Sequence, residues 1–364
     1  MSPATDIHAR ALLLVPHLHV QNANAISSPM TWGFPSITAF TGLMHALERK
    51  LDEDFGLMFS GVGVVCHRFD AQTHKGYTHG FRLTRNPVLK DGSTAGIVEE
   101  GRVHLEISLV FDVELRIDLI DEAARQRLAD AVADTLATLR IAGGSVIAPH
   151  LPLPRHTLRP QLHMVAASAD EQEKEFAKLA RRLLPGFALV ARDDLLKSHL
   201  AALRADAATA DCTLLDAWLD LSRINYRATR TRAGVGSAVD ALANESGAAP
   251  AANPERIEWR RDERPGWLVP IPVGYTALSE LHPPGSVTQA RDAGTPLRFV
   301  ESVFSIGQWV SPHRLRDFEQ LIWWPEYDEA TGLYRCRNDC HPETFKGAAR
   351  QPAADHALTD SLSD

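Results

Sequence analysis

One stretch restricts the fold of this chain more than any other. Residues 104–119, HLEISLVFDVELRIDL, place an apolar side chain at every second position from Leu105 to Ile117, with mostly polar side chains between them. A period of two residues is typical of a β-strand that buries one face and exposes the other. The sequence therefore predicts a sheet with one wet face.

The segments around this strand form a regular order of elements. Residues 12–20 and 61–69 are predicted strands, and between them a helix is expected to begin at Ser36, its N-cap. Residues 121–139 predict a second amphipathic helix, and the glycine turn in 142–149 leads into a short fourth strand. This order, strand, helix, strand, strand, helix, strand, indicates an α+β, ferredoxin-like (RRM-like) fold. RNA-recognition modules use the arrangement, although the fold alone does not determine a function.

The rest of the chain divides by composition. We expect an RRM-like domain at 7–150 with an insertion at 70–101, a helical insertion at 151–226, a flexible linker at 227–265, a β-rich segment at 266–342 that completes the fold, and a disordered tail at 343–364.

The overall composition limits the class of protein. The chain has 364 residues, of which 45% are hydrophobic and 23% charged, as expected for a globular protein. It has no apolar run of about 18 residues, so we expect a cytoplasmic protein without a membrane span. Four scattered cysteines indicate free thiols. The net charge of −8 argues against a protein that coats nucleic acid with its whole surface, but it leaves a local basic groove possible.

The segment between the first strand and the first helix is unusual. Residues 20–36, VQNANAISSPMTWGFPS, contain amide side chains, prolines and aromatic rings. A connection of this length inside a compact domain is usually either disordered or a binding loop, and this one is too aromatic to be disordered. We therefore predict a binding loop. Trp32 and Phe34 could also be core anchors of the loop.

A second long insertion separates the second and third strands. It has about thirty residues, where a ferredoxin-like hairpin needs about two to five. Residues 67–90 carry five basic side chains and only Asp70 as an acid, a net charge of +4, and interleave them with Tyr77, Phe81 and three histidines. This pattern is typical of surfaces that bind single-stranded nucleic acid, while a solvated hairpin is the alternative.

Other motifs carry less weight. His17 and His19 form an H-x-H pattern, but the repeating strand–helix units of a metal-dependent hydrolase are missing. His45 could be a general base, yet no acid or base partner is evident, so a structural histidine is the better interpretation. We expect no metal and no cofactor.

Four segments resemble a known family. They are residues 20–51 (VQNANAISSPMTWGFPSITAFTGLMHALERKL), 274–281 (GYTALSEL), 296–315 (PLRFVESVFSIGQWVSPHRL) and 333–339 (LYRCRND). In this order they closely resemble the family of the second Csy protein of subtype I-F CRISPR systems, in the Cas-five group of the RAMP superfamily.

The resemblance implies a non-catalytic subunit of the Csy complex, a Cascade-type, crRNA-guided surveillance complex of antiviral defence. Such a subunit would bind the 5′ handle of the crRNA, pair with the large Csy subunit, adjoin the backbone Csy subunit and meet target DNA indirectly through the complex. In related RAMP proteins a thumb hairpin between the second and third strands pins RNA. The alternatives are a RAMP-type crRNA-processing endoribonuclease, with His45 or a thumb histidine as the base, and a metal-dependent hydrolase using His17 and His19.

The candidate RNA-binding residues come from the loop, the insertion and the 296–315 segment. Asparagine amides can both donate and accept hydrogen bonds, and a glycine lets another backbone approach closely. In the 296–315 segment we expect Phe299, Val303, Ile306 and Trp309 to be core residues. The candidates are Asn22, Asn24, Trp32, Gly33, Arg68, Lys75, Arg82, Arg85, Gln308, His313 and Arg314.

Overall fold

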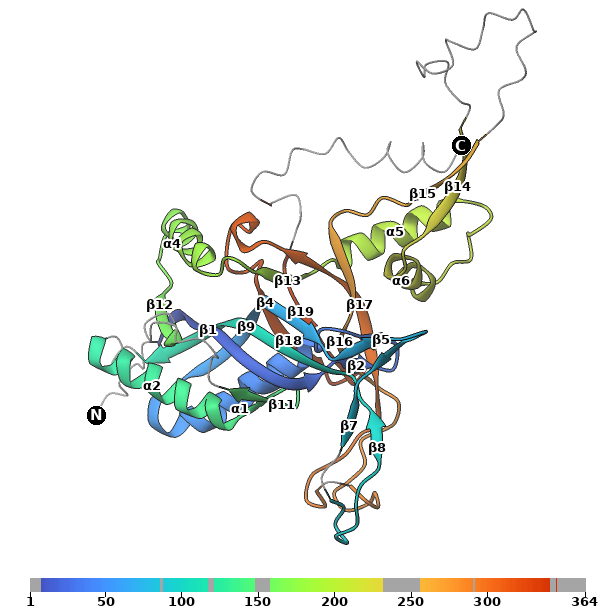
Figure 1. The fold of residues 1–364 in the computed structure, drawn as a ribbon. Helices are drawn as coiled ribbons and strands as arrows, with labels where there is room; N and C mark the ends of the chain where they lie inside the picture. The colour runs from blue at the N-terminus through green and yellow to red at the C-terminus, as the bar shows by residue number, and fades with distance from the viewer. Residues whose placement is uncertain are drawn as a thin grey trace, which may run out of the picture.

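The computed structural model describes residues 8–85, 88–116, 121–147, 158–231, 256–290, 292–340 and 345. Within these residues the chain is a mixed α+β protein with one large antiparallel sheet of 11 strands and five α-helices (Figure 1). None of the helices in these ranges is long and apolar enough to cross a membrane.

The N-terminal half follows the predicted order of elements. Ser36 Oγ accepts a hydrogen bond from the backbone N–H of Thr38 at 3.3 Å, and Asp121 Oδ1 accepts one from Ala124 at 2.5 Å, so both predicted N-caps are confirmed. In the sheet the neighbours run β11-β1-β9-β4, all antiparallel. The elements are β1 (His8–Asn24), α1 (Ile37–Phe55), β4 (Met58–Ala71), β9 (Arg102–Arg116), α2 (Glu122–Thr138), β10 (Arg140–Ile141) and β11 (Gly144–Ile147).

Helices α1 and α2 cover the same face of this sheet. Because the strand side chains alternate, one set points into the core under the helices, and the other set points to the opposite face. On β9 the inward set includes Leu105, Ile107 and Phe111, which are buried in the same core cluster as Phe40 and Met44 of α1. This confirms the alternation that the sequence predicted, but the expected wet face is wrong for the middle of β9, where the outward side chains of Ser108, Val110 and Asp112 are also buried.

The opposite face is only partly covered. At one end of the sheet, Leu12, Leu14 and Val110 pack into a second core with Phe176 and Leu179 of α4. Further along β1, β4 and β9, the same face carries polar side chains.

Residues 162–226 are less helical than we expected. Three helices lie in the described part of the expected helical insertion, but β12 and β13 are strands, and β13 joins β4 to β17 in the main sheet. The five residues of β13, FALVA, are too short a run to show either a helical or a strand period, and the strands that pair with it lie far away in the sequence. The sequence pattern therefore did not distinguish this strand from the helices around it. The elements are β12 (Gln161–Met164), α4 (Ala169–Arg182), β13 (Phe187–Ala191), α5 (Asp193–Ala205) and α6 (Leu214–Ser222).

The C-terminal strands belong to the same sheet as β1. Strand β18 pairs with β4, so the strands β4-β13-β17-β16-β19-β18 close on themselves. The two ends of the expected linker pair as a separate ribbon, and residues 232–255 between them lie outside the described residues, as does the tail apart from Phe345. The elements are β14 (Tyr226–Thr231), β15 (Arg256–Arg261), β16 (Trp267–Ala277), β17 (Val300–Val310), η3 (Pro312–Arg314), β18 (Ile322–Asp328) and β19 (Leu333–Arg337).

The long loop and the insertion form small hairpins outside the main sheet. Strands β7 and β8 make the arm at the bottom of Figure 1. The hairpins are β2 (Ile26–Ser28) with β3 (Thr31–Trp32), β5 (Thr73–Lys75) with β6 (His79–Phe81), and β7 (Leu83–Arg85) with β8 (Ile97–Glu99).

Candidate nucleic-acid interface

The loop after β1 is a rigid hairpin held by its own polar side chains. The amide of Asn24 bonds to the backbone of Ile26 in both directions, accepting from its N–H at 3.0 Å and donating to its carbonyl at 2.8 Å. The hydroxyl groups of Ser28 and Thr31 lie 2.7 Å apart, and Gly33 (φ 123°) donates to the carbonyl of Ala25. Only glycine adopts this backbone angle without strain, so the sequence of the loop determines its shape.

Asn22 stands where β1 leaves the regular ladder. Its φ of 57° is in the left-handed region, which asparagine tolerates better than most residues, and its backbone N–H donates to Nδ1 of His104 at 3.1 Å. The Asn22 side chain is exposed. Of the two asparagine candidates, Asn22 therefore offers its amide to solvent, whereas the Asn24 amide is engaged in closing the turn.

The insertion between β4 and β9 meets this hairpin at its root. Ala25 donates a backbone hydrogen bond to Gly101 at 2.8 Å, and the Trp32 ring contacts the Phe81 ring edge-on at a centroid distance of 5.7 Å. Trp32 nevertheless keeps 61% of its surface exposed. The loop and the insertion, which the sequence singled out separately, thus form one continuous surface.

Basic side chains lie on the strands that lead into the insertion and on its first hairpin. Arg68 on β4, Lys75 at the end of β5 and Arg82 after β6 are all exposed. Arg82 is tied to the root of the insertion, because its guanidinium donates to the side chain of Gln72 at 3.3 Å and to the carbonyl of Thr73 at 3.4 Å. Tyr77, at the turn of the β5–β6 hairpin, is fully exposed.

We call this group the thumb-root surface. It combines exposed aromatic rings, exposed cations and a stiff hairpin, and it contains six of the predicted side chains and one glycine. Arg85 ends β7, but its side chain lies outside the described part of the chain. The members are these seven predicted residues, Asn22, Asn24, Trp32, Gly33, Arg68, Lys75 and Arg82, together with the exposed Tyr77.

The three candidates from the 296–315 segment lie elsewhere. Gln308 is only 6% exposed, and its amide is engaged at both ends, with Oε1 accepting from Arg192 and Nε2 donating to the carbonyl of Pro265 at 3.1 Å. It is therefore part of the packing between β17 and its neighbours, and this amide is not presented to RNA. His313 and Arg314 are exposed on η3, which packs against α4 at the end of the molecule away from β7 and β8 (Figure 1).

Of the four residues expected in the core in that segment, three are buried or packed against the core and one is exposed. Ile306 is fully buried, and Val303 and Trp309 pack against the main core. Phe299 does not, because it lies just before β17 and is 53% exposed, in a T-shaped contact with the ring of His282. The core prediction is wrong for Phe299.

Sequence reasoning missed a polar cluster on the open sheet face. The His17 ring stacks on the His67 ring at a centroid distance of 4.3 Å, and Nδ1 of His17 lies 2.7 Å from Glu106. Both ring nitrogens of His67 are engaged, Nδ1 with the carbonyl of Pro185 at 2.6 Å and Nε2 with Ser108 Oγ at 2.7 Å. Burial lowers the pKa of His67. The H-x-H motif indicated His17, but a contact across three strands leaves no local pattern.

The other histidine candidates are isolated from this cluster. His45 lies on α1, where its nearest ion-pair partner is Glu48 at 3.6 Å. Within the described residues there is no group of three or more His, Cys, Asp or Glu side chains that could hold a metal ion. All four cysteines are free thiols, as predicted.

Comparisons with known proteins agree on one family. A sequence model of the family described as CRISPR-associated protein (Cas_Csy2) matches residues 13–336. The chain is also 46% identical over 331 residues to the CRISPR-associated protein Csy2 of Pseudomonas aeruginosa strain UCBPP-PA14, an alignment that covers 89% of this chain and 94% of that protein.

Proposed function

Because this chain belongs to the Csy2 family of CRISPR-associated proteins, we propose that it is a non-catalytic subunit of the type I-F crRNA-guided surveillance complex and holds the 5′ handle of the crRNA. The thumb-root surface is the seat of that RNA. The observation that carries the proposal is the contact between Trp32 and Phe81, since it joins the binding loop and the basic insertion into one surface.

The chemistry of this surface suits a single-stranded RNA. Exposed Trp32 and Tyr77 offer faces on which bases can stack, and Arg68, Lys75 and Arg82 supply cations for phosphates. The amide of Asn22 can donate a hydrogen bond to a base edge or accept one from it. The hairpin is held by its own hydrogen bonds, so little conformational entropy is lost when RNA binds.

The order of strands supports assignment to the ferredoxin-like RAMP fold. The neighbours β11-β1-β9-β4, with α1 and α2 on one face, are the arrangement of a split βαβ unit. In this proposal the insertion between β4 and β9 is the thumb. The acidic remainder of the chain limits binding to RNA away from the thumb.

The partners in the proposal are proteins of the same complex. The chain pairs with the large Csy subunit, adjoins the backbone Csy subunit and meets target DNA indirectly through the assembly. Exposed His313 and Arg314 on η3 are our candidates for a contact with RNA or with the large subunit. Loss of large-subunit co-purification on Arg314→Glu would support that contact.

The endoribonuclease alternative would need a free acid–base pair. His67 has the neutral imidazole that a general base requires, but both of its nitrogens are occupied by Pro185 and Ser108, so it cannot reach a 2′-hydroxyl without losing a bond. The closest partner for His45 is Glu48, on the next turn of the same helix. These contacts support the non-catalytic assignment.

Binding and cleavage can be measured together. We expect a labelled RNA that carries the 5′ handle to be bound by the purified chain, more tightly with the large subunit present, and to stay intact with or without Mg²⁺. Trp32→Ala should weaken binding about tenfold, the value of one base stack. Cleavage that disappears in His45→Ala would instead establish the endoribonuclease.

The salt dependence of binding tests the cations separately. For every phosphate that Lys75→Ala/Arg82→Ala leaves without a cation, the slope of log K against log salt should become shallower by about 0.7. The matched control is Arg127→Ala/Lys174→Ala, which removes two exposed cations from helices α2 and α4. Equal slopes in the two double variants would exclude the thumb-root surface as the seat of RNA.

A further inference from the structure

A groove outside the thumb-root surface lies beside helix α4. It has a cavity volume of about 400 Å³ and runs between α4, strand β12 and helix α2. One stripe of α4, from Gln172 to Arg182, forms one wall, and residues 162–165 form the other. None of these residues belongs to the thumb-root surface.

The floor of the groove is apolar. Leu12 of β1, Phe176 and Leu179 of α4, and Phe318 are all buried parts of the second core, and the groove is where this core opens to solvent. The two phenylalanine rings are at most 3% exposed. The floor can therefore accept an aliphatic or aromatic side chain, but it offers no ring face on which a nucleobase could stack.

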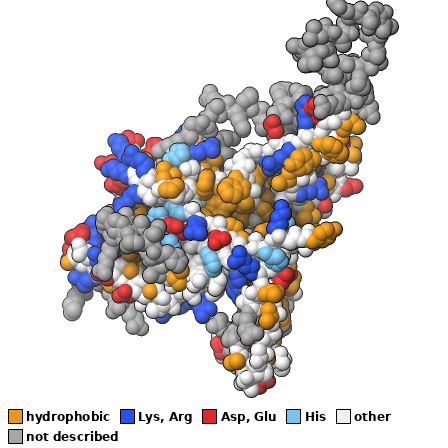
Figure 2. Space-filling view, viewed as in Figure 1, with side chains coloured by type: hydrophobic (Ala, Val, Ile, Leu, Met, Phe, Trp, Pro, Cys, Tyr) orange, Lys and Arg blue, Asp and Glu red, His pale blue; other side chains and the backbone are white. Residues whose placement is uncertain are grey.

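The rim is basic. Arg125, Lys178 and Arg182 line the groove, and Glu175 is the one carboxylate among its lining residues. Within the described residues, no carboxylate forms an ion pair with Lys178 or Arg182. Figure 2 shows Lys and Arg side chains over α4 with Asp and Glu side chains among them, and hydrophobic side chains exposed beside them, so the excess of positive charge is a property of the groove lining and not of the whole helix. The charge of the rim is complementary to an anion.

Two polar atoms at the groove lack a partner. Nε2 of His163 and Nε of Arg125 are buried and have no hydrogen-bond partner in the described part of the chain. An unmet buried donor or acceptor costs about 1–3 kcal/mol. Burial, together with the charge of Arg182, lowers the pKa of His163, so the imidazole is neutral and can accept or donate one hydrogen bond. A bound ligand with polar groups could satisfy both atoms.

Strand β12 offers a third feature. In the described residues it pairs with β1 along one edge, with His163 opposite Leu12, and with no strand along its other edge. An unpaired strand edge is a template for an extended peptide, whose backbone forms ladder hydrogen bonds while alternate side chains enter pockets. The groove lies next to this edge.

We propose that this groove binds a short acidic segment of a partner protein. The segment lies along β12, inserts an apolar side chain onto the floor at Leu12 and Phe176, and presents carboxylates to Arg125, Lys178 and Arg182. The inference requires a protein partner within the assembly proposed above, but it does not depend on where RNA binds. Charge complementarity and the free strand edge together favour a peptide over a nucleic acid.

Cross-linking in the assembled complex identifies the occupant. We would introduce p-benzoylphenylalanine at Lys178 and irradiate the complex purified with its subunits and guide RNA, then map the product by mass spectrometry. A cross-link to one subunit, within a segment that carries Asp or Glu beside apolar residues, supports the proposal. A product with RNA, with a second copy of this chain or with a segment lacking acids overturns it, and so does the absence of any product.

Charge reversal measures the contribution of the rim. Lys178→Glu/Arg182→Glu should weaken retention of the cross-linked subunit at least about tenfold. The matched control, Lys174→Glu/Arg181→Glu, makes the same change in charge on the same helix outside the groove lining and should leave retention unchanged. Equal retention in both variants contradicts the proposal.

Two further measurements separate folding and RNA binding from this site. If the Glu pair fails to fold, as judged by circular dichroism, Lys178→Gln/Arg182→Gln removes the charges without reversing them, and the same loss is expected. The RNA bound per complex is counted in every variant. A failure of the RNA assignment would appear as unchanged RNA affinity in Trp32→Ala, whereas a failure of the groove proposal would leave subunit retention equal in all the groove variants.

Discussion

Two glycines of β4 allow the sheet to close. Strand β18 pairs with β4 so that Ile322 lies opposite Gly63 and Trp323 opposite Val62. A Cβ atom at Gly61 would lie 2.8 Å from the carbonyl oxygen of Trp323, which is backbone and cannot rotate away. These two glycines therefore allow β18 to pack closely against β4, and they do not form a phosphate-binding turn.

Gly61→Ala tests this close approach. We expect the free energy of unfolding to fall by about 1–3 kcal/mol, the usual cost of overpacking. Gly42→Ala is the matched control, because that glycine lies inside α1 with nothing within 4 Å of the added methyl group, and alanine should stabilise the helix by about 0.5–1 kcal/mol. Chemical denaturation of both variants gives the comparison. Equal stability of the two would show that β18 does not approach β4 this closely.

His67 makes stability depend on pH. Burial lowers its pKa in the folded chain, so the unfolded chain binds a proton more readily. His67 therefore makes its full contribution to stability at pH values above about 6.5, the pKa of a histidine in the unfolded chain. This contribution is lost as the pH falls from there toward the lower pKa of His67 in the folded chain. His163 acts in the same direction, since burial also lowers its pKa.

We expect the free energy of unfolding to decrease between pH 7 and pH 5.5, and this decrease to be smaller in His67→Gln. His313→Gln, which changes an exposed histidine on η3, should keep the wild-type dependence. Denaturation at several pH values measures the slope. An unchanged slope in His67→Gln would show that the stacked pair is solvated in the folded protein.

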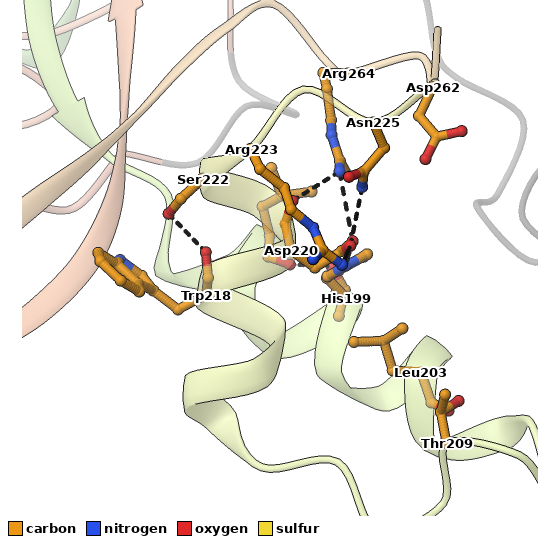
Figure 3. Close-up of polar contacts among 12 residues, drawn as sticks. His199, Leu203, Thr209, Trp218, Asp220, Ser222, Arg223, Asn225, Asp262 and Arg264 are labelled. Atoms are coloured by element: carbon orange, nitrogen blue, oxygen red, sulfur yellow. Dashed lines mark hydrogen bonds and ion pairs between the residues drawn. The ribbon is translucent and has the colours of Figure 1, made fainter. Parts of the chain in front are cut away.

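At the scale of elements, the carboxylate of one residue of α6, Asp220, holds helices α5 and α6 together through hydrogen bonds and ion pairs. Asp220 of α6 lies 2.8 Å from His199 of α5 and accepts hydrogen bonds from Arg223 at 2.9 Å and Asn225 at 3.0 Å, while Arg264 reaches it from the segment after β15 (Figure 3). Partial burial would raise the pKa of Asp220, but these hydrogen bonds hold it well below its ordinary value. The joint connects both helices to the start of β16.

Asp220→Asn should loosen this joint. It replaces a charged acceptor of several hydrogen bonds, so we expect the free energy of unfolding to fall by about 1–3 kcal/mol and amide hydrogen exchange to rise in α5 and α6. Asp211→Asn changes an exposed acid between the same helices and should have no effect. Unchanged exchange in Asp220→Asn would mean that Trp218, whose buried indole donates to the carbonyl of Ser305 at 2.9 Å, is sufficient to hold α6 in place.

At the scale of the whole molecule, periodic segments were predictable and distant pairings were not. The alternation of residues 104–119 indicated β9, and the helical period after Ser36 indicated α1, because each pattern is local. Strand β13 and the closure of β18 on β4 depend on partners more than a hundred residues away. The polar cluster of His17, His67 and Glu106 was hidden for the same reason.

The candidate site was predictable to a similar extent. Composition alone indicated the loop and the insertion, and the structure joins them through Trp32 and Phe81. Gln308 was a reasonable polar candidate in sequence, but the alternation of β17 directs its side chain into the packing, where Arg192 and Pro265 use its amide. A polar residue type does not reveal which face of a strand it occupies.

The central claim is that the 5′ handle of the crRNA lies on the thumb-root surface. The most direct measurement is to incorporate 4-thiouridine into the handle of the guide RNA, irradiate the assembled complex and identify the cross-linked peptides of this chain by mass spectrometry. We predict cross-links to peptides that contain Trp32, Lys75 or Tyr77. Cross-links confined to other parts of the chain, such as α2 or β14, would contradict the claim.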